Sequence, residues 1–371
     1  MKRTAVVFFL VLLLLCFGAF SAAAVQDELF DAAAQTGDQL FALVDDETGQ
    51  TLSSFGLDDF SPESVFDVSW QSVRAFFSNT LSASLNAQWR SFTVSLSLLL
   101  VLAVCGVLLA GSDGADAFEL LSLCAVTVHT AGSLHTYVSA AASVLQTAAG
   151  FMKGFVPVYA ALLAFSGRAG AALSYQTLCF SLAQGISAFA SGWCVPLLGL
   201  FFCLAISFSL NETIRTPAFL SGVNKAASVV LGLAAGLFSG VLSVRNVLAG
   251  AADTVAGKSA RFLVSSLVPV VGSAISDAYS AVVGSIDLIK GSAVVFAFFA
   301  LLVLHLPVLL QLLLCRGGCG VLASFSQMLG QSRLSVLYQS FACGVRLLLL
   351  FTVFECFLLL IATGLTLQLH G

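Results

Sequence analysis

Few side chains in this sequence combine a reactive group with a position that would use it, and the clearest is Glu355. It lies in the middle of an apolar run, residues 343–367, nine residues after Arg346. An ionisable group at such a depth in a membrane is a functional candidate by default. A structural ion pair with an arginine of another helix explains Glu355 at least as well. Glu355 is therefore a candidate functional residue with two open interpretations.

The histidines and cysteines do not predict a metal site. His129 and His135 are six residues apart, which puts them on nearly opposite faces of a helix. Cys315 and Cys319 flank an Arg-Gly-Gly sequence, but no second Cys or His pair lies nearby. The other cysteines of the mature chain lie in or beside apolar segments, where a thiol acts as a small hydrophobic group. We predict no metal and no cofactor.

The sequence also lacks the motifs of an enzyme. It contains no phosphate-binding loop, no Ser/His/Asp order in a soluble domain and no His-Glu metal motif. An intramembrane enzyme would need a nucleophile and a base, and no such pair is evident. We predict that the chain is not an enzyme.

Two near-identical proline motifs, FVPV from Phe155 and LVPV from Leu267, suggest a functional centre. Their prolines, Pro157 and Pro269, are 112 residues apart, and the next prolines follow after 39 and 38 residues. Paired interrupted segments in corresponding halves are typical of the functional centre of transporters. The spacing predicts an internal repeat, residues 118–210 and 226–314. Chance similarity of a short motif is the alternative.

The neighbourhood of these prolines completes the candidate core. A proline removes a backbone donor and obstructs the preceding helical turn, and Gly272 would let two elements approach closely. Arg168 and Asp277 follow their prolines by 11 and 8 residues, so we expect them to meet as an ion pair. The candidate functional residues are Pro157, Arg168, Pro269, Gly272, Asp277 and Glu355.

Composition defines the elements that must position these residues. With 59% hydrophobic and 9% charged residues and a mean hydropathy of +1.02, the chain is an integral membrane protein. The segments long enough to cross a bilayer are 92–110, 118–138, 194–210, 226–244, 293–314 and 343–367. Two interrupted segments, 155–190 and 262–285, are predicted to be re-entrant hairpins or pairs of short spans. The expected fold is all-α, with six to eight transmembrane helices.

The N-terminal part is predicted to be exported. Lys2 and Arg3, an apolar run and three alanines indicate a signal peptide, residues 1–24, with an uncleaved anchor as the alternative. Residues 25–90 carry eleven acids and two bases and form an acidic extracytoplasmic segment. A helix there, with an apolar stripe from Phe66 to Leu85, either packs on its own domain or lies on the membrane surface. The membrane domain is 91–371.

Alternating spans give the predicted topology. An exported N-terminal segment and an even number of crossings place the C-terminus outside as well. The cytoplasmic loops are then 111–117, 211–225 and 315–342. The second and third loops carry Arg215, Lys225, Arg316 and Arg333, as the positive-inside rule requires, whereas the first does not.

The stretch from Val241 to Ala293 also carries a family resemblance. The sequences GVLSVRN, KSARFLVSSLVPVVGSAISDA and LGQSRL, with FVPVYAALLAFSG before them, resemble those of stage III sporulation protein AE. This resemblance runs from about Gly154 to the C-terminus and is most specific over residues 262–278. Proteins of this family are polytopic membrane proteins of endospore-forming bacteria.

The resemblance implies a non-enzymatic membrane subunit of a multiprotein transport or channel complex that connects mother cell and forespore. It places the chain in the mother-cell membrane around the forespore. The implied partners are membrane proteins of the same sporulation operon, including ring-forming subunits, a cytoplasmic ATPase and the forespore channel protein, within a lipid bilayer and without nucleic acid. The interrupted segments leave an autonomous secondary transporter as the alternative.

Overall fold

The computed structural model describes residues 37–57, 68–189, 192, 195–209, 216–267 and 272–364. The predicted signal peptide and the start of the helix predicted from Phe66 lie outside these residues. The helices are α2 (Asp46–Ser54), α4 (Trp70–Leu109), α5 (Ala115–Phe165), α6 (Ala169–Phe189), α7 (Val195–Ser209), α8 (Thr216–Leu267), α9 (Gly272–Met328) and α10 (Ser332–Gly364). Within the described residues there is no strand, so the all-α prediction is confirmed.

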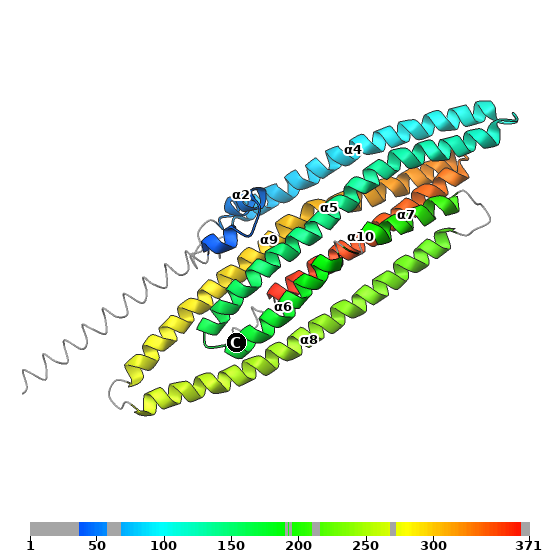
Figure 1. The fold of residues 1–371 in the computed structure, drawn as a ribbon. Helices are drawn as coiled ribbons and strands as arrows, with labels where there is room; N and C mark the ends of the chain where they lie inside the picture. Colours follow the sequence, from blue (N-terminus) through cyan, green and yellow to red (C-terminus); the bar gives the residue numbers. More distant parts are fainter. Residues whose placement is uncertain are drawn as a thin grey trace, which may run out of the picture.

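The bundle is elongated because its helices are long (Figure 1). Helices α5, α8 and α9 have 51, 52 and 57 residues, which at 1.5 Å per residue corresponds to about 75–85 Å. The hydrocarbon layer of a bilayer is only about 30 Å thick. Five helical stretches among the described residues are long and apolar enough to cross it: α4, α5, Ser221–Arg245 of α8, Ile286–Met328 of α9, and Ser332–Thr363 of α10.

The first interrupted segment is more regular than predicted. Helix α5 joins the predicted span 118–138 to the first proline motif and continues through Pro157 without a break. Pro157 lies on the exposed side of the helix, so its ring displaces no core side chain. The chain reverses only at Gly167, whose φ of 80° favours glycine. The amide of Arg168 donates to the carbonyl of Leu163 (3.0 Å), as at a glycine-capped helix end.

The two proline motifs do not begin at equivalent places. Phe155 lies inside α5, ten residues before its end, whereas Leu267 is the last residue of α8. Pro269 lies outside the described residues. Helix α9 then begins at Gly272, so residues 262–285 are divided between two helices. The internal repeat itself remains a prediction.

The segment predicted to be the third cytoplasmic loop, 315–342, is mostly helical, and its side of the membrane stays a prediction. Helix α9 continues to Met328 and α10 begins at Ser332, so only a tight turn separates them. Gly330 has a φ of 78°, and the amide of Gln331 donates to the carbonyl of Ser326 (2.9 Å). The residues after position 315 follow the end of the predicted span 293–314. Buried side chains such as Cys319 and Leu322 keep them helical. This turn and the α4–α5 turn lie at the same end of the bundle (Figure 1).

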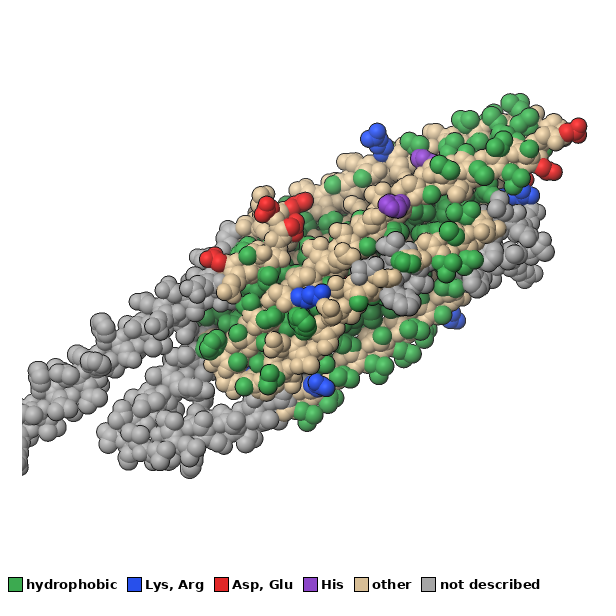
Figure 2. Space-filling model, in the orientation of Figure 1, with side chains coloured by type: hydrophobic (Ala, Val, Ile, Leu, Met, Phe, Trp, Pro, Cys, Tyr) green, Lys and Arg blue, Asp and Glu red, His purple; other side chains and the backbone are tan. Residues whose placement is uncertain are grey.

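The acidic N-terminal segment packs onto the bundle. Leu52 and Phe55 are fully buried, and the Phe55 ring lies 5.8 Å from the Phe299 ring of α9, centroid to centroid. Acids in the first turn of α2 face outward, and Figure 2 shows acidic side chains gathered where α2 lies. Most of the remaining visible surface carries no charge. The apolar stripe predicted for the start of α4 is only partly buried. Val73 packs against this core, whereas the Trp70 side chain is 75% exposed.

Candidate functional site

The structure places only part of the predicted core. Pro157 is exposed on α5, and Arg168 is half-buried in the turn before α6. Gly272 and Asp277 belong to the first turns of α9, and Pro269 lies outside the described residues. A contact between Arg168 and Asp277 therefore stays a prediction. Glu355 is buried in α10.

Arg168 lies near a charged cluster. The ammonium group of Lys290, in α9, is fully buried, forms an ion pair with Asp287 and donates to the Ser166 hydroxyl (3.0 Å). Arg168 lies close enough for its charge to interact with that of Lys290. Among the described residues, Asp287 thus provides the carboxylate of this cluster. Lys290 is not among the site residues predicted from the sequence, because it follows the interrupted segment 262–285.

Glu355 has a histidine partner rather than the arginine considered from the sequence. Its Oε2 lies 2.5 Å from Nε2 of His305 in α9, and both side chains are buried. The other ring nitrogen, Nδ1, is 2.7 Å from the carbonyl of Leu301. A carbonyl can only accept, so Nδ1 carries a hydrogen. One further proton therefore lies between Nε2 and Oε2.

This arrangement makes the pair a neutral unit with one shared proton. It connects α9 to α10 across 50 residues of sequence. The second carboxylate oxygen of Glu355, Oε1, is buried and has no hydrogen-bond partner in the described part of the chain. The signal that could have revealed His305 is a lone imidazole in an apolar run, because such a group requires a polar partner.

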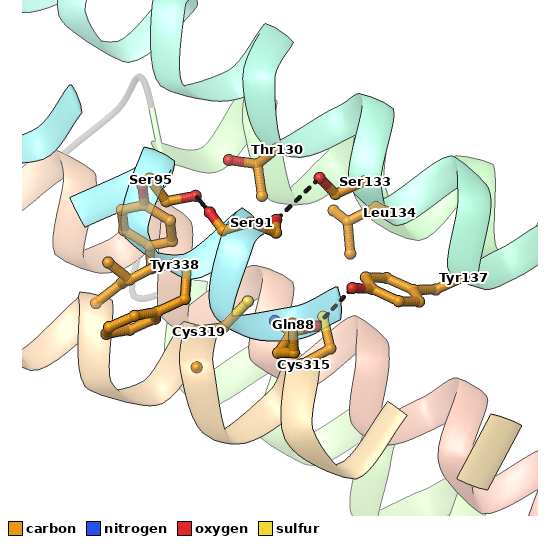
Figure 3. Close-up of a pocket in the computed structure, with 13 residues that line it drawn as sticks. Gln88, Ser91, Ser95, Thr130, Ser133, Leu134, Tyr137, Cys315, Cys319 and Tyr338 are labelled. Carbon is orange, nitrogen blue, oxygen red and sulfur yellow. Dashed lines mark hydrogen bonds between the residues drawn. The ribbon is translucent and has the colours of Figure 1, made fainter. Parts of the chain in front are cut away.

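A small polar cavity forms a second site (Figure 3). It has a volume of about 20 Å³ and lies among α4, α5, α9 and α10. Polar and thiol side chains from all four helices line it: Gln88, Ser91, Ser95, Thr130, Ser133, Tyr137, Cys315, Cys319 and Tyr338. None of the lining residues carries a carboxylate or a formal positive charge.

Hydrogen bonds connect α4 to α5 around this cavity. The Tyr137 hydroxyl donates to Oε1 of Gln88 (2.5 Å), and the Ser91 and Ser133 hydroxyls lie 3.4 Å apart. Nε2 of His129 is 3.1 Å from the Ser95 hydroxyl. His135 is exposed, so the two histidines do not share a site. No group of three or more potential metal-ligating His, Cys, Asp or Glu residues occurs among the described residues.

Long apolar helices around sequestered polar groups define a polytopic helical membrane protein. The sequence profile described as stage III sporulation protein AE matches residues 69–369, from the start of α4 to beyond α10. The chain therefore belongs to the stage III sporulation protein AE family.

One curated relative has the same name as the family. The Stage III sporulation protein AE of Bacillus subtilis (strain 168) is 26% identical over 160 residues. The alignment covers 43% of this chain and 40% of the relative, so it spans less than half of that protein's length. No solved structure matches this chain.

Proposed function

We propose that this chain is a non-enzymatic membrane subunit of a multiprotein transport or channel complex required for endospore formation. The complex would connect the mother cell with the forespore. The observation that carries this proposal is the family match over residues 69–369, because family membership implies a role in sporulation. The match includes every described helix from α4 to α10, so the proposal concerns the whole bundle.

The partners follow from the energy that transport requires. The sequence has no nucleotide-binding motif, so energy for translocation would come from another subunit. We propose a cytoplasmic ATPase for this role, together with ring-forming membrane subunits and the forespore channel protein. The mother-cell membrane around the forespore would hold the chain, with residues 25–90 and the C-terminus extracytoplasmic.

A secondary transporter is the second candidate. It is favoured by the buried His305–Glu355 pair, because intramembrane ionisable groups often mark ion or proton pathways. Such a protein would act alone and would use an ion gradient. The two candidates therefore differ in whether the isolated chain has activity.

Two measurements separate these candidates. We expect deletion of the encoding gene to reduce spore yield and the wild-type chain to restore it. Affinity purification of a tagged chain from sporulating cells, in mild detergent, should recover a stable multiprotein complex that includes an ATPase. A chain that purifies alone and drives uptake into lipid vesicles under an ion gradient would instead establish the transporter.

A further inference from the structure

The polar cavity among α4, α5, α9 and α10 has no role in the proposed function. Its volume of about 20 Å³ accommodates one particle of the size of a water molecule or a bare ion. Larger ligands are excluded. The polarity of the lining therefore determines what the cavity binds.

The hydroxyl hydrogens around the cavity are largely committed. Ser95 donates to the carbonyl of Ser91 (2.9 Å), and Thr130 donates to the carbonyl of Val126 (2.7 Å). The Tyr137 hydroxyl donates to Gln88 (2.5 Å). A hydroxyl has one hydrogen and two lone pairs, so these three oxygens can offer only lone pairs to a ligand.

Two further groups add oxygen atoms to the lining. Ser91 and Ser133 share one hydrogen bond, so one of their oxygens keeps its lone pairs free for a ligand. Tyr338 is fully buried, and its hydroxyl interacts with that of Thr130, whose own hydrogen is committed to Val126, so the Tyr338 oxygen keeps its lone pairs. Figure 3 shows Tyr338 facing Ser95 and Thr130 across the cavity. The cavity is thus rich in acceptors contributed by neutral oxygen atoms.

We propose that this cavity is a binding site for one alkali-metal cation, Na⁺ or K⁺. Neutral oxygens from several elements can replace the hydration shell of a monovalent cation, as rings of carbonyls do in potassium channels. Divalent cations are disfavoured because calcium and magnesium sites require carboxylates, and none lines the cavity. By joining oxygens of α4, α5 and α10, the cation would stabilise the contacts among these three helices.

The test measures thermal unfolding of the purified full chain in detergent. We expect a higher midpoint in NaCl or KCl than in choline chloride at equal ionic strength, because only the small cations fit the cavity. Above the dissociation constant, the midpoint should rise with the logarithm of the cation concentration. Comparing Na⁺ with K⁺ identifies the preferred ion. Retention of about one radioactive sodium or rubidium ion per chain would confirm binding directly.

Two matched substitutions on α5 locate the effect. Thr130→Val keeps the shape of the side chain and removes its oxygen, so it should abolish the difference between alkali-metal and choline salts. Thr147→Val makes the same change at an exposed position of α5 outside the cavity and should leave that difference intact. Equal midpoints of the wild-type chain in all three salts, with no isotope retained, would overturn the proposal and identify water as the occupant.

Discussion

At the level of single residues, the His305–Glu355 contact determines how α9 and α10 are held together. Both groups are buried, and the hydrogen on Nδ1 of His305 is committed to the Leu301 carbonyl. The proton between Nε2 and Oε2 is therefore the only one that the pair can share. If either side chain is removed, the other is left in an apolar environment without its partner.

A double-mutant cycle tests this dependence. His305→Ala and Glu355→Ala should each destabilise the protein, because breaking a buried pair typically costs about 3–5 kcal/mol. The double variant should lose clearly less than the sum, with a coupling energy of about 1–3 kcal/mol. The measurement is the free energy of unfolding of the purified chain in detergent.

Glu355→Gln provides the matched control for this cycle. Its amide can still donate a hydrogen bond to Nε2 of His305, so it should cost less than Glu355→Ala. Val353→Ala, on an exposed position of the same helix, should have little effect. Strictly additive losses for His305→Ala and Glu355→Ala would mean that the two side chains do not interact.

The charge pair predicted from the proline motifs is tested separately. Arg168→Ala or Asp277→Ala should reduce spore yield, and combining Arg168→Asp with Asp277→Arg should recover part of it. The physical reason is that removing one partner leaves the other charge unpaired, at a cost that grows with its burial. Protein amounts are compared by immunoblot, so that a loss of function is distinguished from a loss of protein.

The cluster around Lys290 supplies the comparison for this experiment. Arg168→Asp with Asp287→Arg makes the same exchange with the described carboxylate of that cluster. Rescue by the Asp287 exchange alone would assign Arg168 to the Lys290 cluster. No rescue by either exchange would remove Arg168 from the functional core.

At the level of helices, much of the fold could be predicted, but helix continuity could not. Hydropathy identified the apolar runs and predicted the all-α class. It ends the predicted span at residue 314, whereas α9 continues through Gly317 and Gly318, although glycine in a helix costs about 1 kcal/mol relative to alanine. Packing of Cys319 and Leu322 in the core outweighs that cost. His305 could not be predicted as a site residue for a related reason. Its partner, Glu355, lies 50 residues away in the sequence, and local sequence patterns do not report contacts over that separation.

Two glycines near the end of α9 should change the stability in opposite directions when each is replaced by alanine. Gly330→Ala should destabilise the protein by about 1 kcal/mol, because alanine is strained at a φ of 78°. Gly317→Ala lies inside α9, where an added Cβ meets open space, and should stabilise by about 0.5–1 kcal/mol. Thermal unfolding of both variants is the measurement. A stabilising Gly330→Ala would contradict the glycine-dependent turn.

At the level of the whole molecule, membrane topology is the main prediction. We expect Ser54→Cys and Leu288→Cys, both at exposed positions, to react with an impermeant thiol reagent in intact cells. Residues 25–90 and the hairpin between α8 and α9 would then lie outside. The parent chain with its native cysteines provides the background.

A third cysteine tests whether residues 262–285 cross the bilayer. Lys258→Cys, on α8, should react from the same side as Leu288→Cys if the chain turns back between α8 and α9. Reaction from opposite sides would show that the segment crosses, and it would reverse the topology of everything beyond it. Reaction of Ser54→Cys only after cell lysis would reverse the topology of the N-terminal segment.

The length of the helices also determines how far this protein reaches. A bilayer accommodates about 30 Å of a helix, or slightly more at a tilt of about 20°. Helices α5, α8 and α9 extend to about 75–85 Å. Where these helices cross the bilayer, about 45–55 Å of each lies outside the hydrocarbon layer, divided between the two sides of the membrane by the depth of insertion. A protein that binds one end of the bundle would be held away from the lipid by the length that projects on that side, so the bundle itself contributes to the spacing between a membrane and its partner.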